Sequence, residues 1–218
     1  EMLNEIPKLI EAADKGDEIG VTSGLSRCSQ VWDDVNAIFD RMPERCDPYI
    51  YFHRVRPYIH GWKDNPALGA GLIYEGVAET GGKPQAFRGQ TGSQSSIVPS
   101  MDALLGIGHG HDPLRVFLDE LHIYRPPAHR KFIDAVRAAS KLRAYVEKAG
   151  TPLQRELYND NIIKLARFRT RHLEYAASYI AKQSKDSAGN DTDVGTGGTP
   201  FMKYLKKHRD DAEQHLLK

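Results

Sequence analysis

The chain of 218 residues carries 30 Lys and Arg against 29 Asp and Glu, so its formal net charge at pH 7 is +1. A charge this close to zero, without a basic stripe interleaved with aromatic residues, argues against a nucleic-acid partner. The apolar runs are too short to cross a bilayer and no secretory signal is present, so we expect a soluble, cytoplasmic protein with no membrane partner. The length allows one substantial core in one or two domains.

Two amphipathic segments open the chain. Residues 2–14 predict a short helix that ends at Gly16, and residues 24–41 predict a second helix that stops before Pro43. The expected apolar face of the second helix carries Val31, Val35, Ile38 and Phe39.

An aromatic and basic segment follows over residues 48–60, in which we expect Pro57 to kink a helix that continues to Gly61. Residues 65–92 are rich in glycine and proline and predict a long loop, with residues 72–77 as its candidate strand or extended segment. A loop of this length in a compact domain is usually functional or mobile.

The rest of the chain predicts helices. They are expected over residues 94–107, 114–121, 127–148, 153–183 and 201–217. The polar, glycine-rich segment at about 184–199 predicts a mobile loop, and it lacks the Lys-Ser/Thr and the preceding strand of a phosphate-binding loop. The sequence therefore predicts an all-α protein.

Two pairs of residues could suggest a metal site. Cys28 and Cys46 have no CxxC pattern and no histidine at zinc-ligand spacing, so we expect two free thiols. His109 and His111 flank Gly110, but the surrounding glycines and proline favour a solvated turn over a metal site.

The helix expected over residues 153–183 carries a histidine on its apolar stripe. The stripe, at alternating three- and four-residue steps, comprises Leu165, Phe168, His172, Tyr175 and Tyr179. A buried imidazole needs a partner for its ring nitrogens, because an uncompensated polar atom costs on the order of 1–3 kcal/mol. A lone histidine in this position is usually bound to a carbonyl or a buried water, and a haem iron is the alternative.

Arg169 favours the haem alternative. It lies one turn before His172 and about 60° around the helix, where its guanidinium could reach an anionic group beside a ligated metal. Arg171 and Glu174 point elsewhere and indicate a solvated or interhelical face.

Six segments together resemble the indoleamine 2,3-dioxygenase family, haem enzymes that open the indole ring of tryptophan. In chain order they are YFHRVRPYIHGWKDNP (51–66), GLIYEGV (71–77), GQTGSQSS with DALLGI (89–96 and 102–107), YRPPAHRKFI (124–133), RTRHLEYAASYI (169–180) and GTGGTPFMKYLK (195–206). Their order and spacing are compatible with the family over nearly the whole chain, and the set is highly specific.

The resemblance implies a multi-helix all-α haem domain with haem b as the cofactor and His172 as the proximal iron ligand. It places Arg169 toward a haem propionate and Asp102 as the carboxylate that supports Arg169. It also implies that residues 1–218 form the C-terminal part of the family's sequence as a haem-binding catalytic domain, without the family's small N-terminal domain. We therefore expect the functional protein to include an additional N-terminal segment.

The resemblance also assigns the substrate site. Arg56 is expected to hold the substrate carboxylate, and the aromatic rings of Tyr51 and Phe52 to contact the indole. The matches that line or close the pocket are Thr91, Gly92 and Ser93, with Ser93 on the haem side, and Thr196 in the GTGGT segment. This chain reads Thr-Gly-Ser where a familiar family version reads Ser-Ala-Gly, a change that alters the pocket wall.

The function implied is dioxygenation of L-tryptophan by O2 to N-formylkynurenine, a step of tryptophan catabolism in the kynurenine pathway. No distal acid or base is evident, since His53 is expected on the other face of its helix. A related haem protein acting on another indole, one inserting a single oxygen atom, and a non-catalytic haem sensor or carrier are the alternatives. A structural bundle without haem would leave the Arg56 and GTGGT matches unexplained.

Overall fold

A computed structural model describes residues 1–110, 113–183 and 202–218 of the chain. Its α-helices are α1 (Met2–Lys15), α2 (Glu18–Asp40), α3 (Pro48–Ile50), α4 (Arg56–Ile59), α5 (Ile97–Leu105), α6 (Pro113–His122), α7 (Pro127–Ala139), α8 (Leu142–Ala149), α9 (Pro152–Ala176) and α10 (Met202–Gln214). Two π-helical turns, η2 (Tyr51–Val55) and η6 (Ala177–Ala181), follow α3 and α9. Within the described ranges no β-strand occurs, so the predicted all-α fold is confirmed. The expected mobile loop at 184–199 lies outside them.

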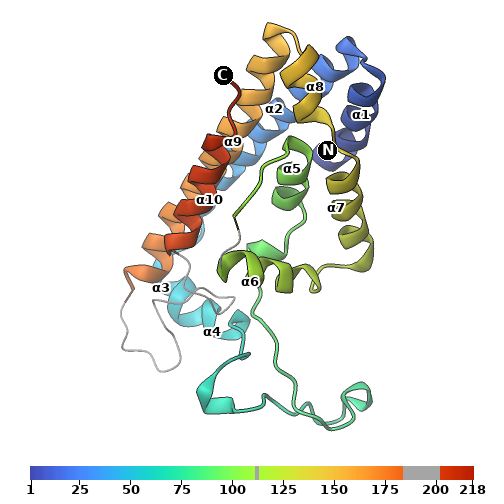
Figure 1. Ribbon diagram of the computed structural model, residues 1–218. Helices are drawn as coiled ribbons and strands as arrows, with labels where there is room; N and C mark the ends of the chain where they lie inside the picture. The colour runs from blue at the N-terminus through green and yellow to red at the C-terminus, as the bar shows by residue number, and fades with distance from the viewer. Residues whose placement is uncertain (111–112, 184–201) are drawn as a thin grey trace.

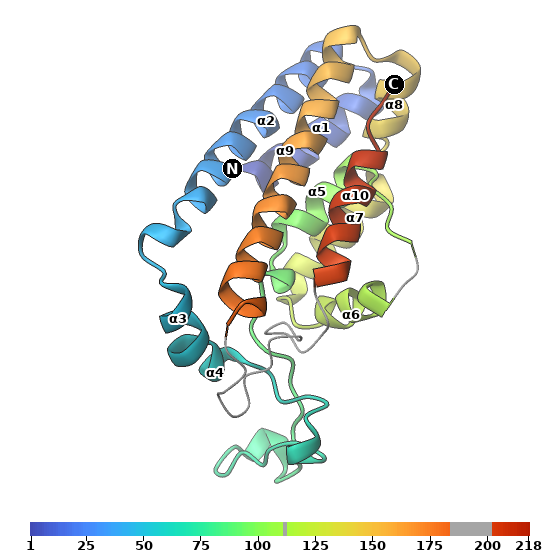
Figure 2. The same ribbon diagram turned by 90° about the vertical axis from the view of Figure 1, so that its left-hand side faces the viewer.

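The long helices α2 and α9 run side by side, with α1 packed on one side and α10 along α9 (Figure 1, Figure 2). Their shared core contains the buried side chains of Leu9, Leu25, Trp32, Tyr158 and Ile162. Helix α1 ends at Gly16, which adopts a left-handed φ of 66°. The first predicted helix and its end are therefore confirmed.

The second helix begins earlier than predicted because Asp17 caps it, its carboxylate accepting a hydrogen bond from the Gly20 N–H at 3.0 Å. A side chain at Gly24 would lie 2.6 Å from Leu9 Cγ, so the close approach of α1 explains this glycine inside α2. The placement of Ile38 on the apolar face was wrong, since that side chain is 70% exposed.

Buried amides hold α9 against α2. Gln154 and Asn161 donate to the carbonyls of Glu18 and Leu25, at 2.9 and 3.0 Å. Asn36 donates in the opposite direction to the carbonyl of Lys164 at 3.2 Å. Because buried polar groups need partners, these bonds fix one rotation of α9 and with it the direction of the side chains further along.

One other expectation was wrong. The helix expected over residues 127–148 is broken into α7 and α8 at Ser140, whose backbone is extended and whose hydroxyl donates to the Leu104 carbonyl at 2.7 Å. Of the two alternatives for residues 72–77, a regular strand is not formed, and the segment contributes a single bridge between Leu72 and Gln85.

The long loop after α4 extends away from the bundle in Figure 1 and returns to its starting point. The Trp62 indole donates to the Gln85 carbonyl at 2.8 Å, and the Gln90 N–H donates to the Ile59 carbonyl at 2.9 Å. Arg88 also bonds Glu120 on α6 through Nη2 at 2.9 Å. These contacts place the residues after Gln90 beside the end of α4.

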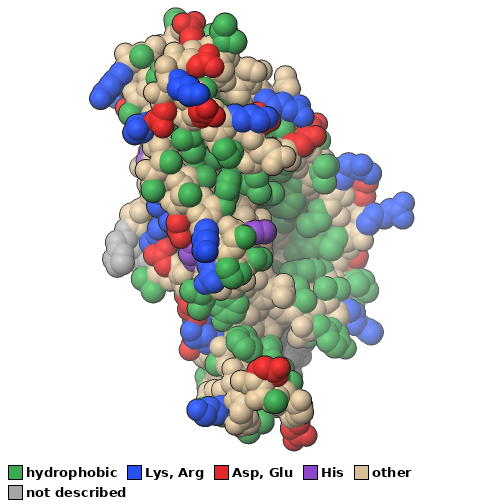
Figure 3. Space-filling view, turned by 90° about the vertical axis from the view of Figure 1, so that its right-hand side faces the viewer, with side chains coloured by type: hydrophobic (Ala, Val, Ile, Leu, Met, Phe, Trp, Pro, Cys, Tyr) green, Lys and Arg blue, Asp and Glu red, His purple; other side chains and the backbone are tan. Residues whose placement is uncertain are grey.

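Figure 3 views the side on which α1 and α7 lie and shows hydrophobic side chains gathered across it. A hollow between these two helices is lined in part by Pro7, Ile10, Phe132 and Val136. Among the helices described, none has the length and apolar character needed to span a membrane.

Candidate haem site

The apolar stripe of α9 packs as its spacing predicts. The ring of Phe168 stacks on Phe39 of α2 with centroids 4.7 Å apart, and the hydroxyl of Tyr175 donates to the Phe39 carbonyl at 2.9 Å. Arg171, outside the stripe, bonds Asp40 at the end of α2 at 2.7 Å, which confirms the interhelical face. His172 thus lies on a rigid and well-anchored stretch of helix.

The imidazole of His172 is partly buried, and no described residue forms a hydrogen bond with its ring. The carbonyl partner that would make it an ordinary core histidine is absent from the described part of the chain. Burial lowers the pKa of His172, which favours the neutral ring. A neutral imidazole with an unshared ring nitrogen is the form that binds iron.

Arg169, one turn earlier, joins α9 to α5. Its Nη2 lies 2.8 and 2.7 Å from the two carboxylate oxygens of Asp102. Burial acts to raise the pKa of Asp102, but the Arg169 guanidinium and the His109 ring outweigh it and hold this pKa at about 2. The carboxylate is therefore negatively charged at neutral pH and balances the positive charge of Arg169.

The other terminal nitrogen of Arg169, Nη1, is buried and has no hydrogen-bond partner among the described residues. An unpartnered buried guanidinium nitrogen is costly, since a donor without an acceptor loses its hydration. A haem propionate beside His172 would supply the missing acceptor. The orphaned donor and the open imidazole, on one face of one helix, both fit a haem.

The expected substrate residues lie on a second element. Phe52 and Arg56 are both fully buried, and the Arg56 guanidinium carbon lies 5.4 Å from the centroid of the Phe52 ring. Pro57 has no N–H to continue the α-helical pattern, and the Arg56 N–H instead bonds the Tyr51 carbonyl in the π-helical turn η2. The kink expected at Pro57 is thus taken up by this turn.

Aromatic contacts tie this element to the end of the His172 helix. Phe52 packs in a small cluster with Tyr179 and Ile180 of η6. The rings of Tyr51 and Tyr179 meet edge to face with centroids 5.8 Å apart, and the Tyr179 hydroxyl donates to the Cys46 carbonyl. The candidate indole-contacting residues and the helix of the candidate iron ligand are thereby held together.

The expected pocket wall lies beside α4. The Thr91 hydroxyl accepts the Ser93 N–H at 3.3 Å and starts a short 3-10 turn that contains Gly92. Buried Arg125, which sequence reasoning missed, donates to the carbonyls of Ser93 and Ser95. Arg125 lies in the segment YRPPAHRKFI that carries the family resemblance, but the sequence assigned it no role. Thr196 lies outside the described residues.

The interpretation of His109 as part of a solvated turn was wrong. Its side chain is 5% exposed, and its ring nitrogens lie 3.3 Å from Asp102 and 3.1 Å from Asp211. His111 lies outside the described residues. Asp102 lies on α5 and Asp211 on α10, so both partners of His109 lie outside the glycine-rich segment that suggested exposure to solvent.

The sequence matches the indoleamine 2,3-dioxygenase family over residues 1–215. The chain belongs to this family. Family members bind haem, which agrees with the open imidazole and the orphaned guanidinium nitrogen on α9.

Several family members show the range of similarity. Indoleamine 2,3-dioxygenase 1 of Rattus norvegicus is 35% identical over 226 residues, covering 99% of this chain and 55% of that protein. A 6-hydroxytryptophan 2,3-dioxygenase of Fusarium equiseti is 31% identical, over 94% of this chain and 54% of its own length. A protein named myoglobin from Haliotis diversicolor is 30% identical, over 96% and 55%. The chain thus spans about half the length of the curated relatives it matches.

Proposed function

We propose that this chain is the haem-binding catalytic part, corresponding to the C-terminal part of the family's sequence, of a dioxygenase that converts L-tryptophan and O2 to N-formylkynurenine. The proposal is supported by two groups on one turn of α9: the His172 imidazole, which bonds no described residue, and the buried Arg169 Nη1, which has no partner among the described residues. A haem b would use both groups, because its iron needs a ligand such as an imidazole and its propionates need a cation such as a guanidinium.

In this proposal His172 holds the haem iron and Arg169 holds a propionate, while Asp102 keeps Arg169 oriented. Bound haem supplies the oxygen chemistry. The protein's task is to fix the position of haem and substrate and to exclude water. The buried Arg169–Asp102 pair suits this task because the carboxylate fixes the position of the guanidinium.

Arg56 is the residue proposed to bind the tryptophan carboxylate, for which the planar guanidinium provides two parallel donors. The ring of Phe52 beneath this guanidinium and the ring of Tyr51 provide the apolar surface for the indole. Thr91, Gly92 and Ser93 form the neighbouring wall, and Thr196 is proposed to close the pocket. The ring of His53 contacts Tyr49 at a centroid distance of 4.4 Å and is given no role in proton transfer.

Two alternatives are supported by specific relatives. The relative named 6-hydroxytryptophan 2,3-dioxygenase supports another indole as the substrate. The relative named myoglobin supports a haem protein without catalytic turnover. A substrate test distinguishes all three.

To test the proposed substrate, the reduced, haem-loaded protein is incubated with L-tryptophan, 6-hydroxytryptophan or indole under 18O2. We expect tryptophan to gain two labelled oxygen atoms and to give a product that absorbs like N-formylkynurenine. Conversion of another indole with tryptophan left intact would contradict the proposed substrate. Reversible O2 binding with no product from any indole would contradict an enzymatic function.

A further inference from the structure

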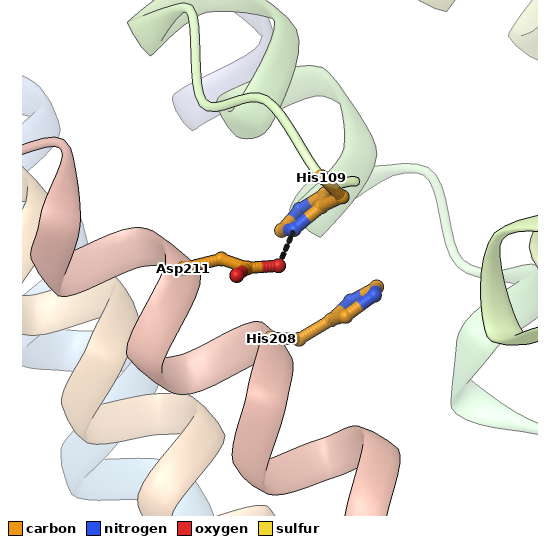
Figure 4. Close-up of side chains that lie close together, drawn as sticks. All are labelled: His109, His208 and Asp211. Carbon is orange, nitrogen blue, oxygen red and sulfur yellow. Dashed lines mark hydrogen bonds and ion pairs between the residues drawn. The ribbon is translucent and has the colours of Figure 1, made fainter. Parts of the chain in front are cut away.

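A second cluster of ligand-type side chains lies where α10 meets the segment after α5. It consists of His109, His208 and Asp211, whose candidate ligand atoms all lie within 4.8 Å of one another (Figure 4). His208 and Asp211 are three residues apart on α10, so both project toward His109 from the same side of the helix. Their exposure is low, with the His208 residue 8% and the Asp211 side chain 14% exposed.

The contacts of His109 require a cation. Its Nε2 lies 3.3 Å from the Asp102 carboxylate and its Nδ1 lies 3.1 Å from Oδ2 of Asp211. A neutral imidazole has one N–H, so when Nε2 donates to Asp102 the lone pair of Nδ1 faces a carboxylate oxygen. Two acceptors this close need a proton or a metal ion between them. Two ligands of a tetrahedral zinc ion are separated by about 3.3 Å, close to the distance seen.

His208 supplies the third ligand. Its Nε2 is buried and has no hydrogen-bond partner among the described residues. The ring stacks on His109 with centroids 4.0 Å apart and an interplanar angle of 6°. Binding a shared ion therefore requires a rotation of His208, which breaks this contact but no hydrogen bond with a described residue.

We propose that His109, His208 and Asp211 bind one divalent transition-metal ion of the zinc type. Two imidazole nitrogens and one carboxylate oxygen suit Zn2+ better than Mg2+ or Ca2+, which prefer oxygen ligands. Asp102 acts as the outer carboxylate that orients His109. Two nearby positive charges oppose the ion: the Lys207 ammonium, 3.7 Å from Asp211 Oδ2, and Arg169, which bonds the Asp102 carboxylate. The cluster adjoins the Asp102–Arg169 pair through His109 and ties α10 to that pair.

The test measures zinc bound per chain in haem-loaded protein that has been treated with a chelator, titrated with ZnCl2 and separated by gel filtration. His208→Ala and Asp211→Asn are compared with wild type and with the control His122→Ala, whose ring contacts Asp134 and Arg125 outside the cluster. We expect one tightly bound zinc in wild type and control. Loss of an outer-sphere partner typically lowers metal affinity by about 10-fold to 100-fold. In both cluster variants the affinity for zinc should fall by more than this.

X-ray absorption at the zinc edge checks the ligands directly and should show imidazole nitrogens at about 2.0–2.1 Å. Asp211→Asn keeps the shape of the side chain and decides the matter if His208→Ala fails to fold. Equal zinc retention in Asp211→Asn and wild type would overturn the proposal. So would a wild-type protein that binds no zinc at pH 7. Protons on both nitrogens of His109 by NMR would then show that a proton occupies the position between His109 and Asp211.

Discussion

Arg169 donates through a single nitrogen, Nη2, to both oxygens of Asp102 at 2.8 and 2.7 Å, and this leaves Nη1 buried without a described partner. The carboxylate of α5 thus orients the guanidinium of α9 while leaving one donor available. Since His172 lies one turn further along α9, the available donor and the open imidazole belong to the same surface. A cofactor with both a metal and an anionic edge fits this surface.

Removing the charge of Asp102 should destabilise the protein. Asp102→Asn leaves the Arg169 guanidinium buried without its counter-charge, a change that typically costs about 3–5 kcal/mol. We expect a clear fall in Tm and weaker haem retention, measured by calorimetry and by haem absorbance after gel filtration. Asp134→Asn, which alters a largely exposed carboxylate, is the matched control. A Tm equal to that of wild type would mean that the pair contributes nothing.

The same pair predicts an acid dependence of stability. The pKa of Asp102 is about 2 in the folded protein against an ordinary value of 3.8, so folding favours the charged form. Its stabilising contribution is complete above about pH 4 and is lost as the pH falls toward 2. The difference in unfolding free energy between wild type and Asp102→Asn should therefore shrink over this window. A difference that stays constant from pH 5 to pH 2 would contradict the assignment.

The contact between Tyr179 and the Cys46 carbonyl should contribute measurably to the packing of α3 on η6. Tyr179→Phe removes one hydrogen bond and is expected to cost about 0.5–1.5 kcal/mol of unfolding free energy. Urea titration followed by circular dichroism measures this change. Tyr58→Phe, at a side chain that is 89% exposed, should leave the midpoint unaltered. If both variants behave alike, the hydroxyl of Tyr179 has no structural role.

Arg56 is predicted to distinguish tryptophan from indole. Loss of a charge-assisted bond to a carboxylate costs roughly 1.5–3 kcal/mol, so Arg56→Ala should raise the tryptophan concentration for half-saturation by about one to two decades. Indole, which has no carboxylate, should be nearly unaffected. Difference spectra of the haem measure both ligands, and circular dichroism checks that the buried substitution is tolerated. Equal losses for the two ligands would assign Arg56 a structural role instead.

Local patterns predicted the elements that depend on nearby residues. The end of α1 at Gly16 and the stripe of α9 around His172 are of this kind, because turn chemistry and helix periodicity decide them. The break at Ser140 depends on the Leu104 carbonyl, which lies 36 residues away in the chain. The burial of His109 depends on Asp211, 102 residues away. A pattern of neighbours contains neither partner, so single-sequence reasoning could not find these features.

His172 is proposed to hold a haem iron. The most direct test is the absorption spectrum of the reduced, haem-loaded protein with and without CO, compared between wild type, His172→Ala and the control His122→Ala. We predict a histidine-ligated ferrous haem and its CO complex in wild type and control, with haem lost or weakly held in His172→Ala. A His172→Ala protein with full haem content and the wild-type CO spectrum would contradict the claim.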